Sequence, residues 1–107
     1  MNNIVELDES TFDVFIAGEL PALVDIWGED CAICQAIAPV VEQIAEKYAG
    51  RLSVASFKAE QTDPIVDRLG LRGIPTLILF KAGQERLRLI GFHSRTEIEG
   101  QLTPHLD

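Results

Sequence analysis

The chain is poor in cysteine, in aromatic residues and in basic residues. Two cysteines, one tryptophan and one tyrosine occur among its 107 residues, and nine Lys and Arg face seventeen Asp and Glu, for a formal net charge of −8. Two cysteines are too few for a disulfide framework that could replace a hydrophobic core. The excess of negative charge repels phosphate backbones, which argues against nucleic acid as a partner.

Long hydrophobic runs are also absent. The longest apolar stretch, Ile74 to Phe80 with Thr76 counted in, falls far short of the ~20 residues that a membrane-spanning helix needs. The first residues, Met1 to Glu6, have neither a basic flank nor a hydrophobic segment ahead of a cleavage site. We therefore expect no membrane partner and a cytoplasmic protein, in which two cysteines rarely form a structural disulfide.

The sequence does have the composition of a packed globular protein. Hydrophobic residues make up 47% and charged residues 24% of this 11.8 kDa chain, which indicates one folded core. No shift in composition, low-complexity stretch or internal repeat divides it. We therefore predict a single domain over residues 1–107, and we expect a monomer.

Alternating apolar and turn-forming segments predict an α/β fold. Strands are expected at 4–7, 22–27, 52–57, 76–80 and 86–90, and helices at 10–18, 31–50, 63–70 and from 94 onward. Strands joined through helices should pair in parallel, and the last two should form an antiparallel hairpin around Ala82-Gly83-Gln84. The predicted architecture is a central mixed five-stranded sheet flanked by four helices.

Helix signals are most specific at three places. Ser10 fits an N-cap with the acidic Asp13 three positions on, and Ser94 with Glu97 matches a capping box. Pro39 lies inside the second helix, where it removes a backbone donor and is expected to kink the axis.

Cys31 and Cys34 form a Cys-x-x-Cys pair between a buried strand and a helix. The first sulfur then lies at the helix N-terminus, where unpaired N–H groups stabilise a thiolate, and the second lies one turn further on the same side. Such a pair can cycle between dithiol and disulfide. The alternatives are two buried cysteines that act as small hydrophobic residues, or half of a zinc site, for which His93 and His105 are the remaining candidate ligands.

Asp25 is the one carboxyl in the apolar run from Ala22 to Trp27. Burial should raise its pKa, so that it could exchange a proton with the Cys34 thiol. The alternative is a carboxyl that only satisfies a local backbone donor.

Four features, in order and spacing, resemble the thioredoxin family. They are the acid before the tryptophan (Asp25 to Trp27), the Cys31 and Cys34 dithiol, the helix proline Pro39, and the turn Gly73-Ile74-Pro75-Thr76. The resemblance covers roughly residues 4 to 103. It implies the thioredoxin fold and a thiol-disulfide oxidoreductase that reduces protein disulfides, with no bound cofactor and no metal, and with a reductase of unspecified identity as electron donor.

The resemblance also implies roles for individual residues. Cys31 would be the nucleophile, Cys34 the resolving cysteine and Asp25 the proton-transfer group. The proline matching Pro75 is cis in thioredoxins, faces the dithiol and lies where backbone pairs with an extended substrate peptide. The implied substrate-binding residues are Trp27, Asp30, Ala32, Ile33, Ile74, Pro75 and Gly91.

The chain departs from the family pattern around the dithiol. Asp30 stands where tryptophan is usual, Ala32-Ile33 replaces glycine-proline, and Gln35 replaces lysine. The family's lysine near the buried acid falls on Ser56, while Lys58, further along the same strand face, is expected to be solvated, with an inward orientation as the alternative.

Asp25 to Gln35 therefore contains three carboxylates and no cation. Each ionised neighbour ~8 Å away disfavours a Cys31 thiolate by roughly 0.5–2 kcal/mol. We predict a raised pKa for Cys31, a weaker oxidant than other family members, and a preference for partner surfaces that are neutral or basic.

A binding function is the alternative to catalysis. In that reading the chain docks extended peptides at the groove around Pro75 and keeps its cysteines redox-idle. The acidic approach to Cys31, without the usual tryptophan, is the feature that supports it. Activity of a Cys31→Ser variant would discriminate the two, because a redox enzyme loses function and a docking module does not.

Overall fold

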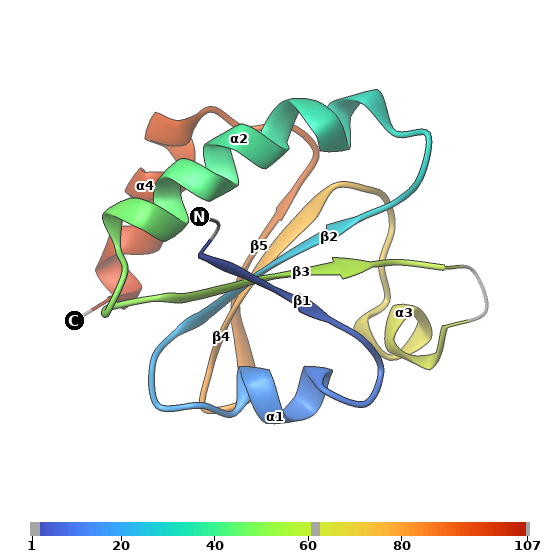
Figure 1. The fold of residues 1–107 in the computed structure, drawn as a ribbon, viewed down its shortest axis with the longest axis horizontal. Coiled ribbons are helices and arrows are strands. Elements are labelled where there is room, and N and C mark those ends of the chain that lie inside the picture. Colours follow the sequence, from blue (N-terminus) through green and yellow to red (C-terminus); the bar gives the residue numbers. More distant parts are fainter. Residues whose placement is uncertain (1–2, 61–62, 107) are drawn as a thin grey trace.

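Five strands form one mixed sheet at the centre of the molecule (Figure 1). The computed structural model describes residues 3–60 and 63–106, so Met1 and Asn2, which enter the expectation about the N-terminus, lie outside the described residues. The strands are β1 (Ile4–Leu7), β2 (Ala22–Trp27), β3 (Ser53–Lys58), β4 (Thr76–Lys81) and β5 (Gln84–Ile90), arranged in the order β1-β3-β2-β4-β5.

Helices cover both faces of this sheet. In Figure 1, α2 (Ala32–Lys47) and α4 (Arg95–Leu102) lie above it, whereas α1 (Phe12–Ile16) and α3 (Pro64–Leu69) lie below, and a short 3₁₀ helix, η1 (Thr103–His105), follows α4. The predicted fold class, a mixed five-stranded sheet with four α-helices, is confirmed.

Strand periodicity decides which side of the sheet each side chain of β2 faces. Leu23 packs in the core between the sheet and helices α2 and α4. Val24 and Ile26 pack in the core on the other side, between the sheet and helices α1 and α3. Because successive side chains alternate, Asp25 shares the α2 face with Leu23. The same alternation in β3 directs Ser56 toward this face, opposite Asp25 in the register of the two parallel strands.

The expected direction of β4 was wrong. β2 and β3, joined through α2, pair in parallel as predicted, but β4, which follows α3, is antiparallel to both β2 and β5. Hydrophobic periodicity identifies a strand but carries no information on its direction, and the connection through the short α3 returns the chain on the far side of β2.

The predicted bounds of α1 were also wrong at both ends. The helix begins at Phe12 with Thr11 as N-cap and ends at Ile16. The missing signal is Asp8, whose Oδ1 accepts hydrogen bonds from the backbone N–H groups of Ser10 and Thr11 at 2.9 and 3.0 Å. An Asp side chain that bonds the following backbone forms a turn, and this turn delays the helix beyond Ser10.

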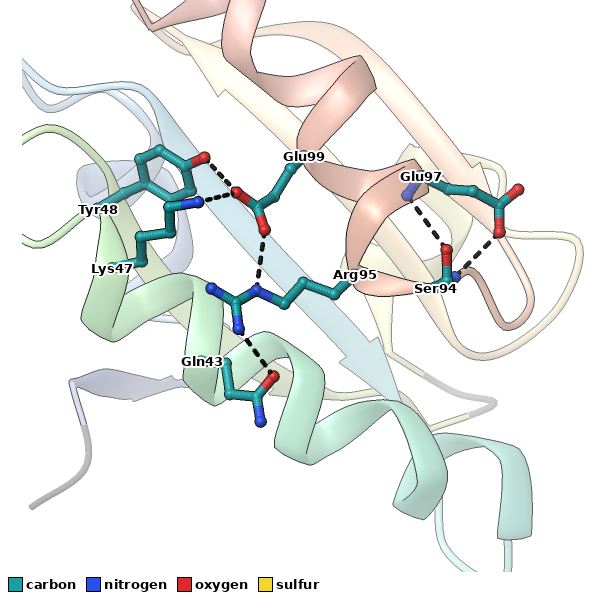
Figure 2. A network of polar contacts seen from close by, with 7 residues as sticks. All are labelled: Gln43, Lys47, Tyr48, Ser94, Arg95, Glu97 and Glu99. Atoms are coloured by element: carbon teal, nitrogen blue, oxygen red, sulfur yellow. Dashed lines mark hydrogen bonds and ion pairs between the residues drawn. The ribbon is translucent and has the colours of Figure 1, made fainter.

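The hairpin and the last helix agree closely with the sequence patterns. The hairpin turn contains only Ala82 and Gly83, both with positive φ, since Gln84 already pairs with Lys81. The predicted capping box is present, because the Glu97 N–H donates to Ser94 Oγ at 3.2 Å and the Ser94 N–H donates to Glu97 Oε1 at 3.0 Å (Figure 2). Pro39 lies inside a helix assigned without interruption, and its kink stays a prediction.

Candidate redox site

Cys31 and Cys34 form a disulfide at the N-terminus of α2. Cys31 is the N-cap residue, its backbone extended, and the backbone N–H of Cys34 donates to Cys31 Sγ at 3.1 Å. The two Cα atoms are 5.2 Å apart, and Cys34 is buried while Cys31 is partly exposed. A sulfur in the N-cap position receives the helix N–H groups that favour negative charge, as the spacing of the pair predicts.

Asp25 is buried in the wall of a cavity that Cys34 also lines. The residue is 6% exposed, and its Oδ1 has no hydrogen-bond partner among the described residues. Removal from water disfavours the carboxylate and raises the pKa of Asp25 to about 6. The predicted rise in the pKa of Asp25 is confirmed. The alternative was a carboxyl that only satisfies a local backbone donor, and Asp25 Oδ1 accepts no such hydrogen bond among the described residues.

A cavity of about 760 Å³ is lined by both Asp25 and Cys34. The predicted site residues Asp25, Trp27, Asp30 and Cys34 line it, and Ser56 completes the wall beside Asp25. Asp25 and Cys34 therefore face the same cavity. The structure brings these residues together from β2, the segment after it, α2 and β3.

A second group of predicted residues lies outside this cavity. The Ile74–Pro75 peptide bond is cis, as the family resemblance implies, and the Gly91 N–H donates to the Pro75 carbonyl at 2.8 Å. A Cβ added at Gly28 would lie 2.5 Å from Ile74 Cδ1, so Ile74 packs over the segment that leads to Cys31. These contacts bring the segment before β4 against both the end of β5 and the approach to the dithiol.

Apolar side chains are exposed around these segments. Ile33, directly before Cys34, is 51% exposed, and Ile74 is 39% exposed. The structure adds Phe92, next to Gly91, which is 52% exposed and was not among the predicted binding residues. The signal for this position in the sequence was an aromatic residue in the loop after β5, directly after Gly91. Asp30 and Ala32 are also exposed, and Asp30 has a positive φ of 54°.

Sequence reasoning also missed the partner of Glu29. Lys58 Nζ forms an ion pair with Glu29 Oε1 and lies 5.8 Å from the centroid of the Trp27 ring. The hydrogen bond raises the pKa of Lys58 and lowers that of Glu29. The segment from Asp25 to Gln35 has no cation of its own, but β3 supplies one to it. The parallel register that places Lys58 opposite Trp27 could not be obtained from local sequence.

The described residues hold no cluster of three or more His, Cys, Asp or Glu side chains placed to bind a metal ion. His93, one of the two histidines that a zinc site would need, instead bonds the Ile90 carbonyl through Nε2 at 3.1 Å. The redox-active group is the disulfide of the protein itself. No helix within residues 3–60 and 63–106 combines the length and apolar character needed to cross a membrane.

The fold and site define a class of proteins: a mixed sheet, helices on both faces, and a disulfide that begins a helix above a buried acid. The thioredoxin family model matches residues 3–103. A thioredoxin of Alicyclobacillus acidocaldarius subsp. acidocaldarius is 38% identical over 96 residues, which are 90% of this chain and 91% of the relative. A thioredoxin of Acidithiobacillus ferridurans is 39% identical over 105 residues, 97% of this chain and 94% of the relative.

Thioredoxin 1 of Nostoc sp. (strain PCC 7120) is 33% identical over 107 residues, 99% of this chain and its own full length. The chain belongs to the thioredoxin family. Membership and the neighbouring cysteine pair make it a thiol-disulfide oxidoreductase of the protein-disulfide reductase type.

Proposed function

We propose that Cys31 is the nucleophile and Cys34 the resolving cysteine in the reduction of protein disulfides. The Cys31 thiolate attacks one sulfur of a substrate disulfide, forms a mixed disulfide and releases the other substrate sulfur as a thiolate. Cys34 then attacks Cys31 Sγ, which closes the disulfide seen here and releases the second substrate thiol. Two electrons pass to the substrate. The observation that carries this proposal is the position of Cys31 Sγ at the helix N-terminus, bonded by the Cys34 N–H.

Asp25 is the proton-transfer group in this scheme. As a carboxylate it accepts the Cys34 proton while Cys34 attacks the mixed disulfide, and it later returns a proton to the cavity. Its burial, its unpartnered Oδ1 and a pKa of about 6 support the assignment, because a base is most useful when its pKa lies near the working pH.

The substrate binds as an extended segment beside the cis Pro75. Ile33, Ile74 and Gly91, with Ala32, form an apolar and backbone surface for the residues around the substrate cysteine. Trp27 supports the segment 28–30 that leads to Cys31. The exposed Asp30 selects substrates with neutral or basic side chains next to their disulfide, by charge complementarity.

The chain acts as a single thioredoxin-like domain, a monomer in the cytoplasm, with no bound cofactor. Its partners are disulfide-containing proteins and a reductase that returns two electrons to the Cys31–Cys34 disulfide. Nucleic acid and membranes are not among its partners, in line with the net charge of −8. No contact among the described residues favours the alternative of a docking module with idle cysteines.

An equilibrium redox titration tests the proposal. The protein is equilibrated in defined thiol buffers, alkylated and weighed, and each cysteine is assigned by peptide mass. A reversible Cys31–Cys34 couple with a midpoint near or below about −270 mV is expected for a reductase of the thioredoxin type. A midpoint above about −180 mV would contradict the reductase direction, and no reversible disulfide would leave only docking.

A further inference from the structure

Lys58 connects β3 to the segment that leads into the dithiol. Its Nζ pairs with Glu29 Oε1, and the same ammonium lies 5.8 Å from the Trp27 ring centroid. Trp27 is also the residue that faces Lys58 in the β2–β3 register. One side chain from another strand therefore contacts both Trp27 and Glu29, the residues on either side of Gly28.

The surroundings of this ammonium are strongly acidic: besides Glu29, the charge of Glu60, two residues further along the chain, also raises the pKa of Lys58. The charged side chains that line the cavity below the dithiol are Glu6 from β1, Asp25 from β2, Glu29 and Asp30 from the connection, Glu42 from α2 and Lys58 from β3. Lys58 is thus the one cation among the described charged residues of this lining. The segments around Pro75 and Gly91 contribute two further basic residues, Arg72 and His93. Both are left unchanged in all the variants described below.

Glu29 is close enough to Cys31 for its charge to affect the thiolate. Two residues apart, their Cα atoms are separated by no more than ~7 Å. An unpaired carboxylate at such a distance opposes a second negative charge, and a cation held against that carboxylate offsets most of the effect. The ion pair is partly exposed, with side-chain accessibilities of 38% for Lys58 and 69% for Glu29, so solvent weakens its effect on Cys31.

We propose that Lys58 is a positioning residue for Cys31: by pairing with Glu29 and covering Trp27, it offsets negative charge beside the dithiol and promotes the reactive thiolate. This inference rests on the proposed function, in which Cys31 is the nucleophile. It also adds to the sequence-based argument that three carboxylates in residues 25–35 oppose a Cys31 thiolate, because Lys58, from outside that segment, pairs with one of the three.

A charge cycle tests the proposal. Lys58→Gln, Glu29→Gln, the double variant and the wild type are reduced, and the alkylation rate of Cys31 by iodoacetamide, a neutral reagent, is followed from pH 5 to 10 by mass. Lys47→Gln is the matched control, because Lys47 also pairs with one glutamate but does so at the far end of α2. Circular dichroism and thermal unfolding establish that each variant is folded.

The expected shifts have opposite signs. Lys58→Gln should move the pH profile upward and reduce the rate constant at pH 7 by about two- to thirty-fold, the range for one uncompensated unit charge ~8 Å away. Glu29→Gln should move it downward. The double variant should return close to wild type, and Lys47→Gln should leave the profile unchanged.

Two different failures are distinguishable. If the profiles of all variants coincide, or if both single changes shift them in the same direction, the role of Lys58 is overturned while Cys31 can still be the nucleophile. If Cys34 is alkylated before Cys31 in the wild type, the proposed function itself fails.

Discussion

Two carboxylates, Asp25 of β2 and Glu99 of α4, lie near opposite ends of α2 and have opposite environments. Near its N-terminal end, Asp25 is buried without a partner for Oδ1, and its pKa rises to about 6. Near its C-terminal end, Glu99 accepts hydrogen bonds from Lys47 Nζ at 2.7 Å, from the Tyr48 hydroxyl and from Arg95 Nε at 2.8 Å (Figure 2). These hydrogen bonds lower the pKa of Glu99 to about 2.

Glu99 is a carboxylate with several partners, whereas Asp25 Oδ1 has none among the described residues. Glu99 connects α4 to the end of α2, because its carboxylate accepts hydrogen bonds from Lys47, Tyr48 and Arg95. Asp25 contributes no such contact through Oδ1, and its ionisation opposes folding near neutral pH, yet it lies in the cavity beside Cys34. This contrast supports the proposed role of Asp25 in proton transfer, because an unsatisfied buried acid contributes little to stability.

The largest effect should come from Cys31, the proposed nucleophile at the N-terminal end of α2. Cys31→Ser is expected to reduce the rate of protein-disulfide reduction by at least about a thousandfold, the scale of losing a nucleophile. Glu99→Gln, at the other end, should retain the rate. Both are measured on one disulfide substrate with excess dithiothreitol. An active Cys31→Ser protein would remove the distinction between the two ends.

Asp25→Asn should stabilise the protein while slowing its resolving step. A pKa shift from 3.8 to about 6 corresponds to about 3 kcal/mol of lost stability at neutral pH, which is the upper limit of the gain, because Asn remains a buried polar group. Urea unfolding of the oxidised form at pH 7 measures it. A variant less stable than the wild type would show that Asp25 has a stabilising partner.

The pH dependence of stability should differ in sign for the two acids. The folded-state pKa of Asp25 is raised, so its contribution is greatest below about 3.8 and declines as pH rises through about 6. That of Glu99 is lowered, so its contribution is present above about 4.5 and declines as pH falls toward about 2. Unfolding curves at pH 3, 4.5 and 7 give the free energy of unfolding as a function of pH. Asp25→Asn should flatten this dependence only on the neutral side, and Glu99→Gln only on the acidic side.

Glu99→Gln itself should have a moderate effect. Three partners lose a shared charge, but Lys47 is 50% and Arg95 39% exposed, so screening limits the decrease in the free energy of unfolding to about 1–2 kcal/mol. Thermal and urea unfolding at pH 7 measure the decrease. A neutral result would mean that the glutamine amide replaces the carboxylate in these bonds.

Lys47→Gln should have the smallest effect. It removes one half-exposed ion pair and leaves Tyr48 and Arg95 on Glu99, so the decrease in the free energy of unfolding should be smaller than that of Glu99→Gln. The same unfolding experiment detects it. A decrease as large as that of Glu99→Gln would show that Lys47 alone carries the connection.

Local patterns predicted the dithiol end well and the surrounding geometry less well. The cysteine spacing, the apolar run around Asp25 and the Ser94 capping box each depend on residues a few positions apart, and each was confirmed. The direction of β4 and the start of α1 were wrong, because one depends on the path of a connection and the other on the Asp8 side chain.

By itself, the sequence determined the class of fold, the redox pair at a helix start and the buried acid, because these follow from periodicity and short spacings. Only the tertiary structure decided which strands lie side by side, and with that the charges around the dithiol. Lys58 reaches Glu29, and Lys47 reaches Glu99, across strand and helix pairings that local sequence does not encode. Electrostatic interactions act through space, so their partners are known only once the chain is folded.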